Sequence, residues 1–382
     1  MEHPLLNEQH HLIRESVRDF AEREIKPIAK ELDDKEEFSI EMTQKMGELG
    51  LFGMVVSPDY GGQGMDYLSY IIAVEELARI DSSQAATIAA GNSLGLNPIY
   101  YYGTEEQKKK YLPLLCSGKK IWGFGLTEPN AGSDSRNSKT IAKLVDGKWI
   151  INGSKIFITN AASEITLGST IQTVSGDNDK GKEFTAIIVE NGTPGFTPKA
   201  MHDKMVWRAS NTAELYFDNC IVDESNILGK RGEGSKIMLS TLDCGRLSIG
   251  AMGLGLAQGA FELALNYAQE RIQFGKPIIK QQVISFKLAD MALKVELARN
   301  LLYKACWLKD HHKAFALEAA MAKLYCSEVA KQVADEALQI HGGYGLMKDY
   351  HIERLYRDQR LLQIGEGTSE IQRLVISRYI GC

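Results

Sequence analysis

The sequence predicts a chain of mixed helix and strand in three parts: helical, then β-rich, then helical again. Apolar residues recur at helical spacing in both outer thirds, whereas the middle third has short β-rich runs separated by Gly, Asn or Pro. The 382 residues are 44% hydrophobic and 24% charged, which suits two or three domains, or one composite built around a cofactor. We place the parts at residues 1–120, 121–232 and 233–382.

The first part is predicted to hold four or five helices. Ile13, Val17, Phe20 and Ile25 fall on one helical face between charged residues. Turn chemistry predicts interruptions at three places: residues 33–34, 57–62 and 97–98.

The middle part is predicted to be a small β-barrel or sandwich. Asp146-Gly147 supplies the positive φ values of a two-residue hairpin turn between strands at 139–144 and 148–151. Further strands are expected at 156–159, 184–189 and 214–217.

The last part is predicted to be an antiparallel helix bundle. Three apolar faces repeat at helical spacing, at residues 254–268, 284–302 and 321–340, and no proline follows Pro277.

Composition excludes several classes of protein. The net charge of −5 gives no field that favours nucleic acid. The first residues lack a basic segment followed by an apolar one, and we expect a cytoplasmic protein, or one of the mitochondrial matrix if the chain is a mature eukaryotic one. The stretch 82–104 is uncharged but broken by polar residues and proline, so no membrane span is expected. Six cysteines without CxxC spacing predict free thiols, and no metal site is predicted.

Two segments near the start of the β-rich part have the composition of a ligand site. Residues 124–134, FGLTEPNAGSD, crowd glycine, hydroxyl and amide groups into a turn whose N–H groups can face an anion or a flat polar ring. Residues 157–160, FITN, place an aromatic ring beside a threonine. Each segment alone is also what an ordinary loop looks like.

Glu366 is a candidate base. It lies between two glycines just before a helix that the capping pattern Ser369-x-x-Gln372 predicts. A carboxylate on such a loop, facing an apolar cavity, would have a raised pKa and could accept a proton from a weak carbon acid. The alternative is an exposed loop residue.

Two glycine-containing helix ends, at 271–277 and 339–345, are typical of C-caps when taken alone. Neither G-x-G-x-x-G after a strand nor G-x-x-x-x-G-K-[ST] occurs, so the familiar dinucleotide and triphosphate sites are absent.

In combination these motifs are specific. LTEPNAGSD, FIT, LDCGR, RIQFGKP, QIHGGYG, YRD and GEGTSEIQR follow one another in the order found in acyl-CoA dehydrogenases, and the chain resembles that flavoprotein family from end to end. The resemblance implies an N-terminal α domain, a middle β-barrel and a C-terminal four-helix bundle, assembled as a homotetramer built from dimers.

The resemblance also implies bound FAD. The residues that would hold its isoalloxazine ring are Phe124, Leu126, Thr127, Gly132, Ser133, Phe157, Ile158 and Thr159, and Thr368 and Glu370 would reach the same cofactor. The residues that would contact the adenine and pyrophosphate end of a partner subunit's FAD are Arg271, Phe274, Gln282, Gln339, Ile340, Gly342 and Gly343.

By the same resemblance, the CoA thioester substrate would contact Ser133, Asp243, Arg246, Gly365 and Gly367. Glu366 would remove the α-proton while the β-hydride goes to the flavin, and its own N–H would polarise the thioester oxygen. One branch of the family carries the base on the bundle helix, where this chain has Gly245. The choice therefore falls on Glu366.

Substrate size is predicted from departures from the family pattern. Short-chain relatives usually have Tyr where this chain has Gly365, which leaves space for a short branched or alicyclic acyl group ahead of linear butyryl. The lack of charge at 82–103 disfavours an acyl chain that ends in a carboxylate. Val206-Trp207 replaces a usual Gly-Ile, and no effect is predicted for it.

Electron-transferring flavoprotein is the expected electron acceptor. An acyl-CoA oxidase or an enoyl-CoA reductase using the same site is the alternative within enzymes. A scaffold that has lost activity is disfavoured because Glu366, Thr127, Ser133 and Arg246 are all present.

Overall fold

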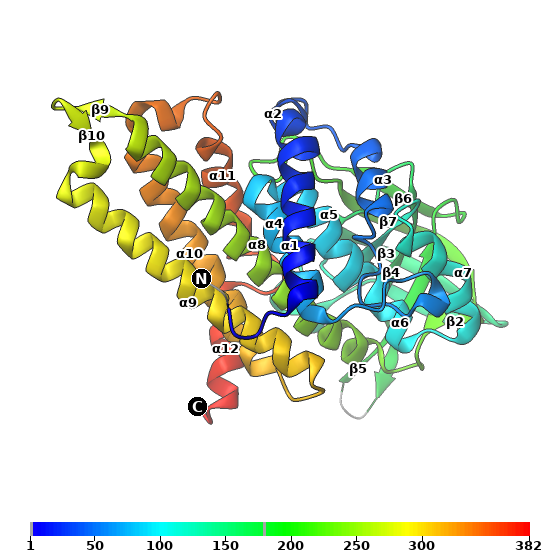
Figure 1. The fold of residues 1–382 in the computed structure, drawn as a ribbon. Helices are drawn as coiled ribbons and strands as arrows, with labels where there is room; N and C mark the ends of the chain where they lie inside the picture. The colour runs from blue at the N-terminus through cyan, green and yellow to red at the C-terminus, as the bar shows by residue number, and fades with distance from the viewer. Residues whose placement is uncertain (1–2, 179–180) are drawn as a thin grey trace.

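The computed structural model describes residues 3–178 and 181–382. Its N-terminal helices lie between a β-sheet on one side and long C-terminal helices on the other (Figure 1). This arrangement confirms the predicted order of helical, β-rich and helical parts.

The N-terminal part has more helices than the four or five expected. Asn97-Pro98, predicted as a turn, begins a helix instead, because proline in a first turn costs no hydrogen bond. Asp33-Asp34 also lies inside a helix, and only 57–62 turns as predicted, around a short 3₁₀ segment. The α-helices described here are α1 Glu8–Phe20, α2 Lys26–Lys35, α3 Ile40–Glu48, α4 Tyr67–Ile80, α5 Ser82–Ala90, α6 Asn97–Tyr102 and α7 Glu105–Cys116, with π-helical segments at Ala21–Ile25 and Gly91–Leu96.

Helices α4 and α5 form the centre of the molecule. Every residue of both helices is buried. Asp66 caps α4 by accepting from Ser69 N at 2.8 Å, and Asp81 caps α5 by accepting from Gln84 N at 2.9 Å. Both helices contact α8 (Gly234–Glu270), and α5 also contacts β3 (Lys148–Thr159), so this pair joins the C-terminal part to the β-rich part.

The middle part is an eight-stranded sheet with the order β6-β7-β3-β2-β4-β5-β8, and β1 pairs with β4. The predicted hairpin at Asp146-Gly147 is confirmed: both residues have positive φ, 49° and 72°, and Val145 pairs with Lys148. Four strands were not predicted, β1, β4, β6 and β8, and the run 156–159 is the end of a longer strand. The strands are β1 Ile121–Gly125, β2 Ile141–Val145, β3 Lys148–Thr159, β4 Thr166–Asn178, β5 Gly181–Glu190, β6 Phe196–Ala200, β7 Thr212–Asp223 and β8 Ile227–Leu228.

The sheet wraps around its own core. Side chains from β2 to β7 meet in one cluster that includes Trp149, Ile171 and Ile187. Within it the rings of Phe196 and Phe217 stack with centroids 5.0 Å apart. Strands from across the sheet therefore direct side chains into one shared core, as in a barrel.

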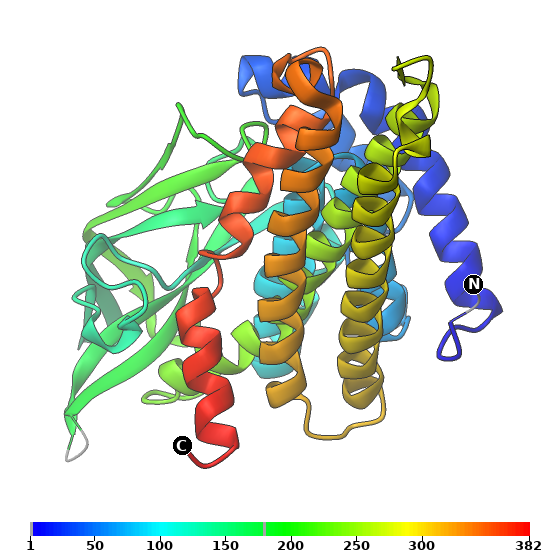
Figure 2. The same ribbon diagram turned by 90° about the vertical axis from the view of Figure 1, so that its left-hand side faces the viewer.

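The C-terminal part is a helix bundle, as predicted. Helix α8 contacts both α9 and α10, and α9 and α10 run side by side with α12 beyond them (Figure 2). A short hairpin of β9 Ile272–Gln273 and β10 Lys276–Pro277 joins α8 to α9. The helices are α8 Gly234–Glu270, α9 Gln282–Asp310, α10 Ala316–His341, α11 Ile352–Leu362 and α12 Ser369–Tyr379.

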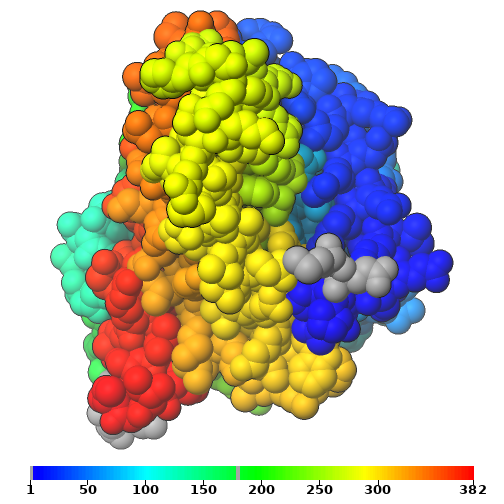
Figure 3. Space-filling model, turned by 60° about the vertical axis from the view of Figure 1, so that its left-hand side comes forward, coloured from blue at the N-terminus to red at the C-terminus, as the bar shows by residue number. Residues whose placement is uncertain are grey.

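Helix α8 is the axis of this part. By length and composition alone it could cross a membrane, but 78% of its most apolar window is buried inside the fold. A Cβ on Gly255 or Gly259 would lie 2.1 Å from a main-chain oxygen of α4, so glycine is needed at both positions for this close contact. Helix α9 (yellow) lies on the outer surface between α10 and the N-terminal helices (Figure 3).

Candidate active site

The loop between α11 and α12 presents the carboxylate of Glu366. Glu366 has a left-handed backbone, φ 52°, followed by Gly367 with φ 91°. Its Oε2 is buried and has no hydrogen-bond partner among the residues described. Burial raises the pKa of Glu366 to about 7, and the positive charges of Lys323 and Arg246 partly oppose that rise. This is the environment predicted for a base that acts on a weak carbon acid.

Gly245 on α8 makes room for this carboxylate. A Cβ added to Gly245 would lie 1.7 Å from Oε2 of Glu366 and 3.3 Å from Cδ2 of Leu94. The side chain of Glu366 therefore occupies the space that a side chain at position 245 would fill. Position 245 on α8 and Glu366, the two positions considered for the base in the sequence analysis, are therefore neighbours in the structure.

The loop is held by polar side chains from two helices. Gln372 Nε2 donates to the main-chain oxygens of Glu366 and Gly367, at 3.2 and 2.9 Å, and Lys323 Nζ donates to that of Gly367 at 2.7 Å. The predicted Ser369-x-x-Gln372 capping box is wrong by one residue. Thr368 caps α12 by accepting from Ile371 N at 3.2 Å, because Gln372 is engaged with the loop instead.

Arg246 lies next to Gly245 on α8. Its Nη1 contacts Oδ1 of Asp243 at 2.5 Å, one turn earlier. Its Nε is buried and, within the described part of the chain, unpaired. Arg246 Nε is thus a buried donor, and Glu366 Oε2 a buried acceptor, without a partner among the described residues. Buried polar atoms are normally hydrogen-bonded, so these two atoms indicate a site for a polar ligand.

The two segments with ligand-site composition are adjacent. Ile156 N donates to Thr127 O at 3.0 Å, and Lys155 Nζ donates to Leu126 O at 3.3 Å. Phe157 has φ 62° and is 63% exposed, so its ring stands free beside this junction. A Cβ on Gly132 would meet no atom within 4 Å, which leaves that part of the loop open to a ligand.

The residues predicted to contact the cofactor differ in how exposed their side chains are. Ile158 is 3% exposed and packs in the barrel core, so only its main chain is available to a ligand. Thr127 and Thr159 are half-buried, and Ser133 is exposed. Thr368 uses its hydroxyl oxygen as a cap, and Glu370 is exposed.

A buried ion pair fixes the first segment. Lys155 Nζ contacts Glu128 Oε1 at 2.7 Å, with the two side chains 0% and 7% exposed. The same carboxylate accepts from Lys139 N at 2.6 Å and Thr140 N at 3.0 Å. Since each carboxylate oxygen is paired, the charge of Glu128 is compensated and the loop has a single well-defined geometry.

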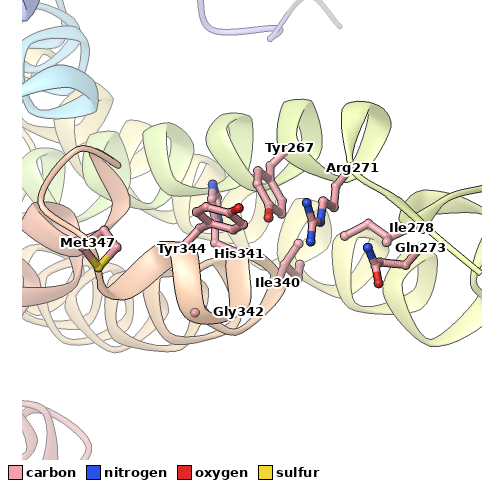
Figure 4. A pocket seen from close by; sticks show the side chains of 10 residues that line it. Tyr267, Arg271, Gln273, Ile278, Ile340, His341, Gly342, Tyr344 and Met347 are labelled. Carbon is pink, nitrogen blue, oxygen red and sulfur yellow. The ribbon is translucent and has the colours of Figure 1, made fainter.

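Four of the seven remaining predicted residues line a second, separate site at the ends of α8 and α10. A cavity of about 680 Å³ is lined by Arg271, Ile340, Gly342 and Gly343. Arg271 lies over the ring of Tyr344, 5.3 Å from its centroid, and both face the cavity (Figure 4). No residue of the Glu366 group lines this cavity. Phe274, 93% exposed, and the exposed Gln282 and Gln339 are outside its lining.

These two groups fit the two ends of FAD. The exposed ring of Phe157, the open loop at Gly132 and the unpaired polar atoms of Glu366 and Arg246 suit a flat ring with a thioester beside it. The second group offers an arginine, glycine N–H groups and aromatic rings to a pyrophosphate and an adenine. Because the groups are separate in one chain, the second fits a cofactor held mainly by another subunit.

Comparison with known proteins identifies the family. Models of the N-terminal, middle and C-terminal domains of acyl-CoA dehydrogenase match residues 7–119, 123–220 and 232–381. The chain belongs to the acyl-CoA dehydrogenase family. A probable acyl-CoA dehydrogenase of Bacillus subtilis is 48% identical over 376 residues, 98% of each chain.

Two solved structures of the family have nearly the same fold. Butyryl-CoA dehydrogenase from Megasphaera elsdenii superposes with a TM-score of 0.95 at 43% identity, covering 100% of both chains. A chain from a study of the electron-transferring flavoprotein of Acidaminococcus fermentans superposes with a TM-score of 0.96 at 44% identity, also over both whole chains.

Several residues around the site escaped the sequence analysis. Lys323 and Gln372 hold the Glu366 loop, but a lone Lys or Gln in a helix gives no local signal. Tyr70, on α4, is buried near Glu366, and its hydroxyl lies 2.9 Å from Ala89 O and Ser248 Oγ. Leu94 belongs to a π-helical segment, and such segments are frequent at functional sites.

Trp207, for which no effect was predicted, links the β-rich part to α11. It is 6% exposed and has φ 48°. Its main-chain N–H donates to Asp358 Oδ1 at 2.8 Å, and its indole Nε1 donates to Asp358 O at 3.2 Å. Helix α11 leads directly to the Glu366 loop, so the two hydrogen bonds of Trp207 help to fix the helix that positions this loop.

Proposed function

We propose that the chain is an FAD-dependent dehydrogenase that removes the α-proton and β-hydride of a short acyl-CoA thioester to give the 2-enoyl-CoA. The observation that carries the proposal is Oε2 of Glu366, which lies buried against Gly245 and has no hydrogen-bond partner in the described part of the chain. With a pKa of about 7, it is substantially ionised at neutral pH and still basic enough to accept a proton. FAD, when bound, supplies the acceptor for the β-hydride.

The thioester oxygen has a donor within the same residue. The main-chain N–H of Glu366 has no acceptor among the residues that the structure describes. A free N–H next to the base can stabilise the negative charge that grows on the thioester oxygen as the α-proton leaves. The base and this donor are fixed relative to each other because they belong to one residue, which the loop contacts hold in place.

The proposed acyl group is short and branched or alicyclic. Leu94 lies beside Gly245 and Glu366, so an apolar side chain borders the space next to the carboxylate. A Cβ on Gly365 would lie 2.9 Å from Cδ2 of Leu361, so a larger residue at 365 would have to displace that methyl group, and glycine leaves this position next to Glu366 without a side chain. The similarity to butyryl-CoA dehydrogenase supports linear butyryl-CoA as the second candidate.

A steady-state panel of thioesters separates these candidates. A branched or cyclic thioester such as cyclohexanecarboxyl-CoA should have a higher kcat/KM than butyryl-CoA, and Gly365→Tyr should reverse the order. If butyryl-CoA is turned over much faster than every branched and cyclic thioester, Gly365 does not widen the pocket and the linear substrate is correct.

We propose electron-transferring flavoprotein as the acceptor and a homotetramer as the assembly. The similarity to the Acidaminococcus fermentans chain supports the first, and the separate second group of residues supports the second. An oxidase would instead consume oxygen when substrate is added, and an enoyl-CoA reductase would run the reaction in reverse with a reduced donor.

Flavin colour tests the proposal as a whole. Purified protein should be yellow and should bleach when the acyl-CoA is added without air. Glu366→Gln should keep the flavin and lose the bleaching, whereas Glu15→Gln, which changes an exposed glutamate of α1, should bleach like the parent. A preparation that cannot be loaded with flavin, or a Glu366→Gln variant that still bleaches, would overturn the proposal.

A further inference from the structure

Lys323 is a fully buried lysine directly beneath the base loop. It lies on α10 with 0% of its surface exposed. Its Nζ donates to Gly367 O at 2.7 Å, and no carboxylate oxygen of a described residue lies within ion-pair distance. An ammonium group buried without a paired carboxylate is costly, so its retention here needs a reason.

The charged and titratable groups around Glu366 come from three helices. Arg246 faces it from α8, Lys323 from α10 and the phenol of Tyr70 from α4. Arg246 is already paired with Asp243, so its charge is partly neutralised. Lys323 is the group whose positive charge has no closer partner than Glu366, with Glu370 of α12 contributing from farther away.

Lys323 also acts on the loop mechanically. Gly367 O accepts from both Lys323 and Gln372, and Gln372 additionally holds the carbonyl of Glu366. These contacts fix a backbone that is left-handed at two successive residues. A shift of Nζ would therefore move the peptide that follows the base.

We propose that Lys323 is a positioning residue for Glu366, which fixes the following peptide and balances the negative charge of the base. The inference rests on the proposed role of Glu366. Burial lowers the pKa of Lys323 to about 8, while the Glu366 carboxylate opposes that fall. Near neutral pH, Lys323 is thus protonated while Glu366 is changing charge, and it favours the ionised, basic form.

The test compares three variants of the FAD-loaded protein. Lys323→Met removes the charge and the hydrogen bond. Lys331→Met, on the exposed side of the same helix, is the matched control. Gln372→Leu removes the other hydrogen bond to Gly367 O without changing a charge. The primary measurement is the infrared titration of the Glu366 carboxyl stretch without substrate, assigned by its loss in Glu366→Gln, and the second is the pH profile of anaerobic flavin bleaching.

The expected result is a pKa of Glu366 that rises by about one pH unit or more in Lys323→Met. The bleaching profile should shift to higher pH with it. Lys331→Met and Gln372→Leu should leave the pKa near that of the parent, although Gln372→Leu should slow bleaching by loosening the loop. If Lys323→Met does not fold, Lys323→Gln, which keeps a donor but no charge, must show the same rise.

An unchanged pKa in Lys323→Met, or an equal rise in Lys331→Met, would overturn the inference. The infrared titration separates this failure from a failure of the proposed function, because it needs no turnover. Glu366→Gln that still bleached would remove Glu366 as the base, yet the effect of Lys323 on that carboxyl would stay measurable.

Discussion

Gly245 and Glu366 cannot both carry a side chain at the base position: a Cβ at residue 245 would lie 1.7 Å from Oε2 of Glu366. The two residues come from the middle of α8 and from the loop before α12, yet they share one small space. Any substitution on α8 at this point therefore acts directly on the position of the base.

Gly245→Ala is expected to displace the Glu366 carboxylate and to lower kcat/KM by about 100-fold or more, the loss that a misplacement near 1 Å can cause. FAD content should stay unchanged because no FAD-binding segment is altered. The control is Gly250→Ala on the same helix, whose Cβ would lie 3.0 Å from Cδ1 of Leu302 and in ordinary contact, at 3.8 Å, with the main chain of Ala322. Equal kcat/KM values for the two variants would contradict the prediction.

The raised pKa of Glu366 predicts a pH-dependent loss of stability. Between its usual value of 4.5 and about 7, the folded protein binds more protons than the unfolded chain, so the free energy of unfolding falls as pH rises. The full effect is about 3 kcal/mol, present below pH 4.5 and lost above pH 7. Glu366→Gln should lack this fall.

Denaturant unfolding of the parent and of Glu366→Gln at several pH values between 4.5 and 8 measures this difference directly. All other titrating groups are common to both proteins and cancel. Parallel stability curves for the two proteins would show that the carboxylate is already ionised at the lower pH and that burial does not raise its pKa.

Asp358 on α11 accepts a hydrogen bond from Trp207, and Asp358→Asn should be less destabilising than Asp358→Ala. Burial and the nearby Asp81 raise the pKa of Asp358 to about 7, and its Oδ1 accepts from Trp207 N. Asp358→Ala leaves that buried N–H unpaired, so a loss of about 1–3 kcal/mol is expected. Asp358→Asn keeps the acceptor and should lose less. Thermal unfolding ranks the two, and an equal loss would show that the charge, rather than the hydrogen bond, matters.

Arg271 should be needed for cofactor retention and not for folding. Its contact in one chain is the ring of Tyr344, worth about 0.5–1 kcal/mol at an exposed site. Arg271→Met should therefore leave thermal stability nearly unchanged while lowering the flavin absorbance per protein after gel filtration. Lys276→Met, in the same hairpin, is the control. A variant that retains full flavin would place the pyrophosphate elsewhere.

The sequence predicts well those elements that have a local signal. The hairpin at Asp146-Gly147 follows from two residues that tolerate positive φ. Strand β1, buried at all five positions, shows no alternation and was missed, and the wholly buried α4 and α5 have no exposed face to give a clean helical period. Burial on all sides removes the patterns on which such predictions depend.

The sequence analysis proposed the motif residues of the candidate site but did not identify the residues that hold those motifs in place. Glu366 stands out between two glycines and through the resemblance. Lys323 does not, because a lysine in an alanine-rich helix is normally solvated, and only the fold shows that its side chain is 0% exposed. The choice of Glu366 over a base at position 245 of α8 was available from the sequence, but the proximity of these two positions in the fold was not.

The hydrogen bond from Ile156 N to Thr127 O joins the two segments that we predict to face the cofactor into one unit before any ligand arrives. Together with the buried ion pair of Lys155 and Glu128, this hydrogen bond orders both segments in advance. Few of their residues therefore have to become ordered when a ligand binds. Association of a flat ring there would carry a small conformational-entropy cost, and its departure would not be helped by loop opening. We therefore expect the flavin to exchange slowly with free cofactor, as a permanent component rather than as a co-substrate.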